Sequence, residues 1–190
     1  MDTATVKDLM VPLDEYVTVS QESTLYEAVL VLEKAQEELD RTRYLYLHRA
    51  ILVFDKTNKM VGKISQLDIL RALEPKYGEM GEPRSLSKAG FSPNFLKSML
   101  EQYSLLAEPF NEVCSKAANL KVKEFMYTPT EGEYVEENAS LREAIHRFIM
   151  GHHQSLLVVR GEEIVGILRL TDMFKEVFQT IKTCMLQHRV

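Results

Sequence analysis

An internal repeat constrains the fold more than any other feature of this sequence. The segment VKDLM at residues 6–10 returns as VKEFM at residues 122–126, which is 116 positions later. Val19 and Val135 match at the same spacing. Self-similarity of this kind indicates a duplicated structural unit. The chain therefore contains two copies of one unit.

The back half of each copy matches at a different spacing. Gly62 corresponds to Gly166 and Asp68 to Asp172, now 104 positions apart. The first copy therefore carries 12 more residues than the second between its front and back halves. We expect these residues to lengthen the first helix of that copy through Asp40 and beyond. The solvated end of this helix would carry Arg41, Arg43, Tyr44 and Tyr46.

The sequences of the two copies predict the same order of elements, namely a strand, a helix, two strands and a second helix. Apolar residues at helical spacing, from Leu25 in one copy and Leu141 in the other, predict the first helix. Two apolar runs joined by a polar turn predict a hairpin, and the second helix begins near Ser65 or Leu170. This βαββα order predicts a mixed α/β (α+β) fold. The predicted strands are 16–19, 51–54 and 60–64, and then 133–135, 156–159 and 164–168.

The repeats divide the chain into three parts. Residues 1–74 form the first repeat, and residues 121–190 form the second repeat with a C-terminal helix. The part between them, 75–120, is longer than a normal connection. Phe95, Leu96, Met99, Tyr103 and Leu106 stand at helical spacing, as do residues of 110–118. We expect a helical insertion, and a mostly disordered segment is the alternative.

Composition and charge narrow the classes of function. The net charge of -5 provides no overall positive field for nucleic acid. No run approaches the roughly 20 apolar residues of a membrane helix, and the first ten residues lack the order of a signal peptide. We therefore expect a cytoplasmic protein. For Cys114 and Cys184, buried free thiols are favoured over a disulfide.

The step from the hairpin into the second helix carries the most specific motif. In the first copy it reads GKISQLDIL from Gly62, with Ser65 and Asp68 in a Ser-x-x-Asp pattern. Together with Asp8-Leu9-Met10, which opens the copy, this pattern resembles the cystathionine-β-synthase (CBS) repeat. Two such repeats form a Bateman module, and the resemblance covers residues 6–74 and 122–180. It implies two repeats related by pseudo-two-fold symmetry.

The resemblance also implies a ligand. Pairs of CBS repeats bind adenine nucleotides (AMP, ADP or ATP) or S-adenosylmethionine in clefts between the repeats. It implies that Asp68 holds the ribose hydroxyls and Ser65 supports ribose or phosphate, while Asp172 is the ribose candidate of the second copy. A carboxylate accepts from two neighbouring hydroxyls, and a helix N-terminus favours phosphate. The implied lining of the base pockets is Thr18, Val19 and Ile51, with Val135 and Leu156.

The second copy departs from the motif at one position. Arg169 stands where the first copy has Ser65. This arginine either clamps a phosphate or fills the second pocket and leaves it empty. Two further cations, Arg49 before the first hairpin and His153 after a predicted helix end, either lie at the surface near a helix terminus or contact phosphate.

Helix capping is the alternative role for the Ser-x-x-Asp motif. Ser65 would be the N-cap, and the carboxylate of Asp68 would lie in the first turn. The presence of Asp172 behind Arg169, which cannot cap, weakens that alternative. An acidic residue in the first turn of a helix is favourable without any ligand, however. Both roles therefore remain open for Asp68.

Two classes of function follow from these observations. The first is a non-catalytic regulatory module that senses an adenine nucleotide and forms a homodimer through its helices. The second is a ligand-free module for dimerisation or for interaction with another protein, which Arg169 favours. An enzyme is not expected, because the sequence shows no nucleophile with a base, no P-loop and no cluster of metal ligands.

Overall fold

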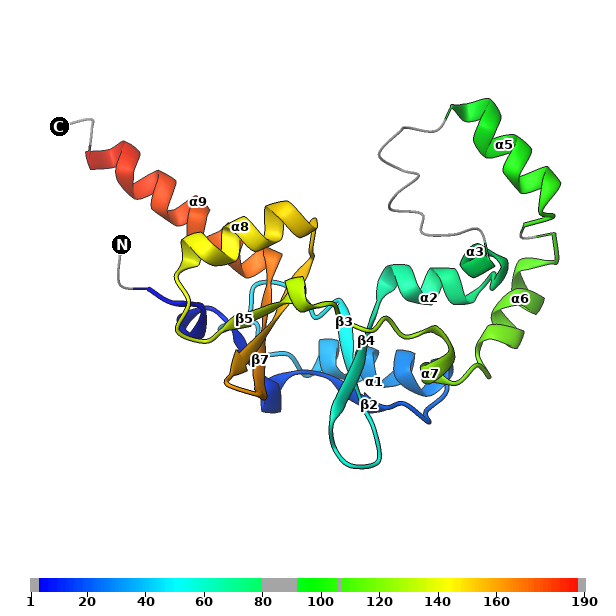
Figure 1. Cartoon of the computed structure of the whole chain (residues 1–190), viewed down its shortest axis with the longest axis horizontal. Coiled ribbons are helices and arrows are strands. Elements are labelled where there is room, and N and C mark those ends of the chain that lie inside the picture. The colour runs from blue at the N-terminus through cyan, green and yellow to red at the C-terminus, as the bar shows by residue number, and fades with distance from the viewer. Residues whose placement is uncertain (1–3, 80–91, 106, 188–190) are drawn as a thin grey trace. The chain divides into compact units, whose positions relative to one another are not determined.

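The structure, a computed structural model, describes residues 4–79, 92–105 and 107–187. Its chain forms two compact units, neither of which is continuous in sequence (Figure 1). The described residues of 18–37 and 49–127 form one unit, here called the α1 unit. Residues 4–17, 38–48 and 128–187 form the other, here called the α9 unit.

The α1 unit contains a three-stranded sheet in the order β2-β3-β4. Strand β2 (Thr18–Ser20) is parallel to β3 (Ala50–Phe54), which forms an antiparallel hairpin with β4 (Met60–Ser65). Buried Ile51, Leu52 and Val53 place β3 in the core of the unit. The helices of this unit are α1 (Leu25–Glu37), α2 (Gln66–Ala72), α3 (Lys76–Glu79), α5 (Pro93–Gln102), α6 (Phe110–Ala117) and α7 (Val122–Phe125).

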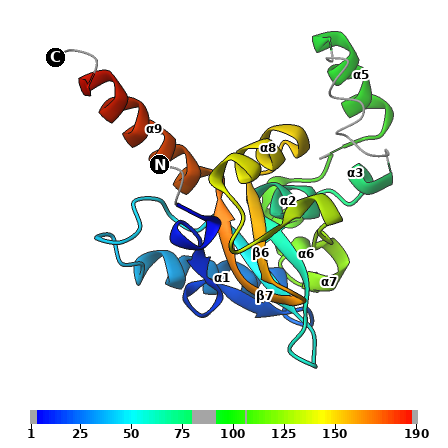
Figure 2. The same cartoon turned by 60° about the vertical axis from the view of Figure 1, so that its left-hand side comes forward.

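The α9 unit contains a four-stranded sheet in the order β1-β7-β6-β5. Helix α8 (Leu141–Gly151) packs on β6, and α9 (Leu170–Gln187) follows directly from β7 (Figure 2). The strands are β1 (Val11–Pro12), β5 (Tyr134–Glu136), β6 (Ser155–Arg160) and β7 (Glu163–Arg169), with short 3-10 helices at Val6–Asp8, Leu13–Glu15 and Glu131–Glu133. Its core is built from Val6, Val135, Ala144, Phe148, Leu156, Val158, Leu168 and Met173.

The segment that opens each repeat packs in the unit built mainly from the other repeat. Val6 is fully buried in the α9 unit, where its backbone N–H donates to the carbonyl of Ala139 at 3.0 Å. Val122 is fully buried in the α1 unit, where its N–H donates to the carbonyl of Ser23 at 2.8 Å. Each unit therefore contains residues of both sequence repeats.

The matched glycines allow this close approach. A Cβ atom on Gly62 would lie 2.7 Å from the sulfur of Met126, and one on Gly166 would lie 2.6 Å from the carbonyl oxygen of Val11. Real Cβ atoms do not come so close to other heavy atoms. Only glycine fits at these two positions without moving the opening segment of the other repeat.

We expect Gly166→Ala to lower the free energy of unfolding by about 1–3 kcal/mol, because the new methyl group overpacks the contact between β1 and β7. Urea unfolding measures the change. Gly132→Ala is the matched control, since its Cβ would meet nothing closer than the His153 ring nitrogen at 3.8 Å. If both variants lose the same stability, the approach of β1 does not explain Gly166.

The structure confirms the mixed α+β fold and both predicted hairpins. It also confirms helices in the insertion, as α5 and α6, although Leu106 and residues 80–91 of that prediction lie outside the described residues. Both cysteines are free, but the prediction that they are buried is wrong, because Cys184 is exposed and Cys114 is half-buried. None of the described helices is both long and apolar enough to cross a membrane.

The predicted extension of the first helix is wrong. Helix α1 ends at Glu37, and residues 38–48 belong to the α9 unit instead. The carboxylate of Asp40 accepts from the backbone N–H of Thr42 at 2.8 Å and from its hydroxyl at 2.6 Å. Such local bonds from an aspartate compete with helical hydrogen bonds. The chain turns at this point.

Candidate functional site

In the first copy, Ser65 and Asp68 lie at the junction of β4 and α2. The Oδ2 atom of Asp68 accepts from the backbone N–H of Ser65 at 2.8 Å and from its hydroxyl at 2.6 Å. The Ser65 hydroxyl oxygen also faces the backbone N–H of Asp68 at 3.3 Å. These contacts form a complete capping box. The capping role considered for the motif is therefore confirmed.

The second carboxylate oxygen of Asp68 has a different environment. Asp68 is 8% exposed, and its Oδ1 atom lies 3.6 Å from a guanidinium nitrogen of Arg71. The Arg71 side chain is 37% exposed. Capping therefore uses one oxygen of Asp68, while the other faces a partly exposed cation. The two roles considered for Asp68 do not compete for the same atom.

The residues expected to line the base pockets are mostly core residues. Val19 and Ile51 are buried in the α1 unit, and Val135 and Leu156 are buried in the α9 unit, whereas Thr18 is exposed on β2. Strands β2 and β5 are edge strands of their sheets.

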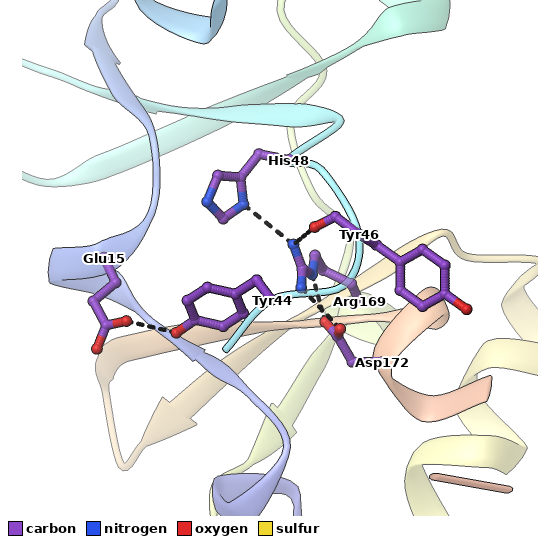
Figure 3. A network of polar contacts seen from close by, with 6 residues as sticks. All are labelled: Glu15, Tyr44, Tyr46, His48, Arg169 and Asp172. Carbon is purple, nitrogen blue, oxygen red and sulfur yellow. Dashed lines mark hydrogen bonds and ion pairs between the residues drawn. The ribbon is translucent and has the colours of Figure 1, made fainter. Parts of the chain in front are cut away.

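In the second copy, Arg169 and Asp172 form a buried ion pair at the junction of β7 and α9 (Figure 3). Arg169 is 5% exposed. Its Nε and Nη2 atoms donate to the two oxygens of the Asp172 carboxylate, the latter bond at 2.8 Å. A bidentate, charge-assisted pair is among the strongest polar contacts in proteins.

The third nitrogen of Arg169 is held by the segment 38–48. Nη1 donates to the backbone carbonyl of Tyr46 at 3.0 Å and lies 3.3 Å from Nδ1 of His48. The guanidinium carbon also lies 5.4 Å from the centre of the Tyr44 ring, within cation–π distance. All three guanidinium nitrogens therefore have partners inside the α9 unit.

His48 is the most buried member of this network, at 2% exposed. Burial and then the charge of Arg169 lower the pKa of His48 from 6.5 to about 4. The imidazole is therefore neutral at pH 7, so that Nδ1 accepts from Arg169. The ring also meets the ring of Tyr16 edge-on, with centroids 4.5 Å apart.

Tyr44 connects the network to Glu15. Its hydroxyl donates to the Glu15 carboxylate at 2.6 Å (Figure 3). The Arg43 guanidinium pairs with the same carboxylate at 2.7 Å. Burial and the bond to Glu15 raise the pKa of Tyr44 to about 12. Arg41 and Arg43 are exposed as predicted, but they do not end a helix, and Tyr44 and Tyr46 are half-buried rather than solvated.

The comparisons with known proteins identify the family. A sequence profile described as the CBS domain matches residues 6–75 and again residues 122–179. The chain belongs to the CBS-domain family. Both copies of the CBS domain match, in agreement with the tandem repeat. No curated protein matches the chain.

Solved structures of CBS-domain proteins share this fold. A CBS-domain protein of unknown function from Bacillus anthracis has a TM-score of 0.60 at 20% identity, covering 94% of this chain and 95% of that one. CBSX2 in complex with AMP has a TM-score of 0.55 at 17% identity, covering 93% and 97%. The CBS domains of a transcriptional regulator from Streptococcus pneumoniae have a TM-score of 0.54 at 13% identity, covering 92% and 98%.

Arg49 and His153 are the remaining candidates of this CBS pair. Arg49 is exposed just before β3. The ring of His153 occupies the space where Gly151 lacks a side chain, 1.9 Å from an ideal Cβ position. His152 ends α8 in a left-handed conformation with φ of 50°. A contact of Arg49 or His153 with phosphate stays a prediction.

Sequence reasoning missed His48 as a partner of Arg169 and Glu15 as a partner of Tyr44. One signal was available. The two departures from the repeat are the 12 extra residues and Arg169, and the structure brings them together. Arg169 replaces a small residue at a helix start, and the first copy has the longer connection. Together these two departures suggest that the longer connection supplies the partner of Arg169.

Proposed function

We propose that this CBS pair is a non-catalytic regulatory module that binds one adenine nucleotide beside Asp68. The arrangement that carries the proposal is the buried Asp68 carboxylate, whose Oδ2 atom completes the cap while Oδ1 faces Arg71 at 3.6 Å. A carboxylate oxygen accepts well from ribose hydroxyls, and the cap holds it in a fixed orientation.

Two relatives support this proposal. CBSX2 has been solved in complex with AMP, and the Streptococcus pneumoniae structure consists of the CBS domains of a transcriptional regulator. A regulatory module acts through different affinities for two arrangements of the same chain. Nucleotide binding at Asp68 would supply the difference in free energy between them.

Asp68→Asn is expected to weaken nucleotide binding about ten- to a hundred-fold. The variant keeps the size of the side chain, but a hydrogen bond from ribose to a charged carboxylate contributes roughly 1.5–3 kcal/mol, against about 0.5–1.5 kcal/mol for a bond to a neutral amide. Calorimetry with AMP, ADP, ATP and S-adenosylmethionine measures the affinity, and thermal unfolding measures the cost of altering the cap. Ser140→Ala, the N-cap of α8, is the matched control, because it removes a capping hydroxyl at about 1 kcal/mol of stability and lies outside the candidate site.

If Asp68→Asn melts lower but binds nucleotide as the wild type does, Asp68 only caps α2. If the wild type gives no heat with any of the four ligands, the sensor function is wrong. The protein-interaction alternative then takes its place. One observation favours that alternative, namely the large apolar side chains exposed along α9, where Phe174, Phe178 and Ile181 are 45–60% exposed.

We expect two chains to form a homodimer through these helices, because contiguous exposed apolar side chains mark association surfaces. Phe178→Asp would shift the dimer toward monomer, since the charge would be buried in the interface. Light scattering at micromolar concentration measures the mass. Gln179→Asp, at an exposed neighbouring position of α9, should leave the mass unchanged. A monomeric wild type would contradict the dimer.

A further inference from the structure

The second CBS copy has its ribose candidate covered by the chain itself. Asp172 corresponds to Asp68, but both of its carboxylate oxygens accept from Arg169. Arg169 is in turn held by the carbonyl of Tyr46 and by His48. The contacts therefore run from the expected ligand position into the segment 38–48, through one buried guanidinium.

We propose that residues 38–48 form an intramolecular cover over the second nucleotide position, with Arg169 as the residue that holds the cover in place. This inference rests on the proposed function, because it concerns the second position of the same module. The cover leaves the chain with one nucleotide site, beside Asp68.

Competition for Asp172 supports the cover. A ribose offers two neutral hydroxyl donors, whereas Arg169 offers a charged, planar fork that matches both carboxylate oxygens. Ribose would therefore have to displace a stronger partner. A phosphate would have to draw Arg169 away from Asp172, Tyr46 and His48 together, which would leave the buried carboxylate without its cation.

The remaining space supports the same conclusion. A cavity of about 210 Å³ borders Asp172, and Arg43 and Tyr44 form part of its lining. Pockets for small molecules usually occupy about 300–1,000 Å³. The Tyr44 side chain, held by its bond to Glu15, and the Arg43 side chain thus form walls of a space that is small for a nucleotide.

The length of the connection distinguishes the two copies. Helix α8 and strand β6 are joined by three residues, 152–154, whereas 12 residues, 38–49, join α1 to β3. Tyr44, Tyr46 and His48 all belong to the longer connection. The cover therefore belongs to a connection that is 12 − 3 = 9 residues longer than its counterpart, and the second copy has no equivalent segment between its helix and its hairpin.

Calorimetry with AMP, ADP and ATP tests the cover through the number of nucleotides bound per chain. We expect one for the wild type. We expect two nucleotides per chain for a shortened variant that carries two changes. Arg169→Ser restores the motif, and the three residues 152–154 are copied in place of residues 38–49. Because the shortened chain could misfold, Arg169→Ser combined with Tyr44→Ala provides a full-length variant, and circular dichroism checks the fold of both. Arg147→Ser, on the exposed face of α8, is the control and should bind one.

The outcomes separate the cover from the proposed function. Two equivalent nucleotides on the wild type would overturn the cover and leave the function standing. One nucleotide on the wild type and still one on a folded, uncovered variant would also overturn the cover. No nucleotide on the wild type but one on the uncovered variant would support the cover and overturn binding beside Asp68. No binding to either would overturn both.

Discussion

Arg169→Met is expected to lower the free energy of unfolding by about 3–5 kcal/mol, the usual cost of removing one partner of a buried ion pair. The side chains of Arg169 and Asp172 are only 6% and 14% exposed. The variant leaves the Asp172 carboxylate with little water and without its cation. It also removes the side-chain donor to the Tyr46 carbonyl. Urea unfolding of the full chain measures the effect.

An exposed ion pair of the same unit is the matched control. Arg147 and Glu143 pair at 2.8 Å on α8, with side chains 34% and 46% exposed. Arg147→Met should cost less than about 1 kcal/mol, because water screens such pairs. The double variant Arg169→Met, Asp172→Asn should recover much of the loss, since it removes the uncompensated charge. A cost below 1 kcal/mol for Arg169→Met would mean that the network contributes little to stability.

The hairpins and helices could be predicted because their signals are local. Residues 51–54 and 60–64 are apolar runs on either side of a polar turn, and the structure pairs them as β3 and β4. Ser65 and Asp68 stand three positions apart at a helix start, which is the local pattern of a capping box. In each of these elements the partners are close in sequence.

The predictions that were wrong concern residues whose partners are distant in the sequence. Residues 38–48 contain apolar and charged residues at a spacing that also suits a helix, and nothing local reveals Glu15 or Arg169 as their partners. The partners of Arg169 include Tyr46 and His48, which are more than 120 residues away in the sequence. Nor could the repeat reveal that Val6 and Val122 each pack in the unit of the other copy.

Lowering the pH from 7 to 5 is expected to reduce the free energy of unfolding by about 2 kcal/mol through His48 alone. The pKa of His48 is about 4 in the folded chain, against its ordinary value of 6.5, which we take for the unfolded chain. Above pH 6.5 the imidazole is neutral in both states, and its contribution is fully present. Below that pH the unfolded chain binds a proton that the folded chain does not, so stability falls. The loss levels off near pH 4, at about 3 kcal/mol.

The groups around His48 fix the sign of this effect. Burial and the positive charge of Arg169 lower its pKa, and the more distant charge of Asp172 opposes them only in part. The rings of Tyr16 and Tyr44 occupy the space where water would stabilise an imidazolium. His48→Gln removes the titrating group and keeps an acceptor for Arg169. The stability difference between pH 7 and pH 5 should therefore shrink by about 2 kcal/mol in this variant.

The wild type and His48→Gln share all their carboxylates. Comparing the stability difference between pH 7 and pH 5 in the two proteins therefore isolates the contribution of His48. His146→Gln, at an exposed position of α8, is the control for replacing a histidine outside the network. If His48→Gln keeps the full acid sensitivity of the wild type, the imidazole is not the group that couples the cover to pH. If His48→Gln alone loses it, mild acid weakens the same contact that holds residues 38–48 against Arg169.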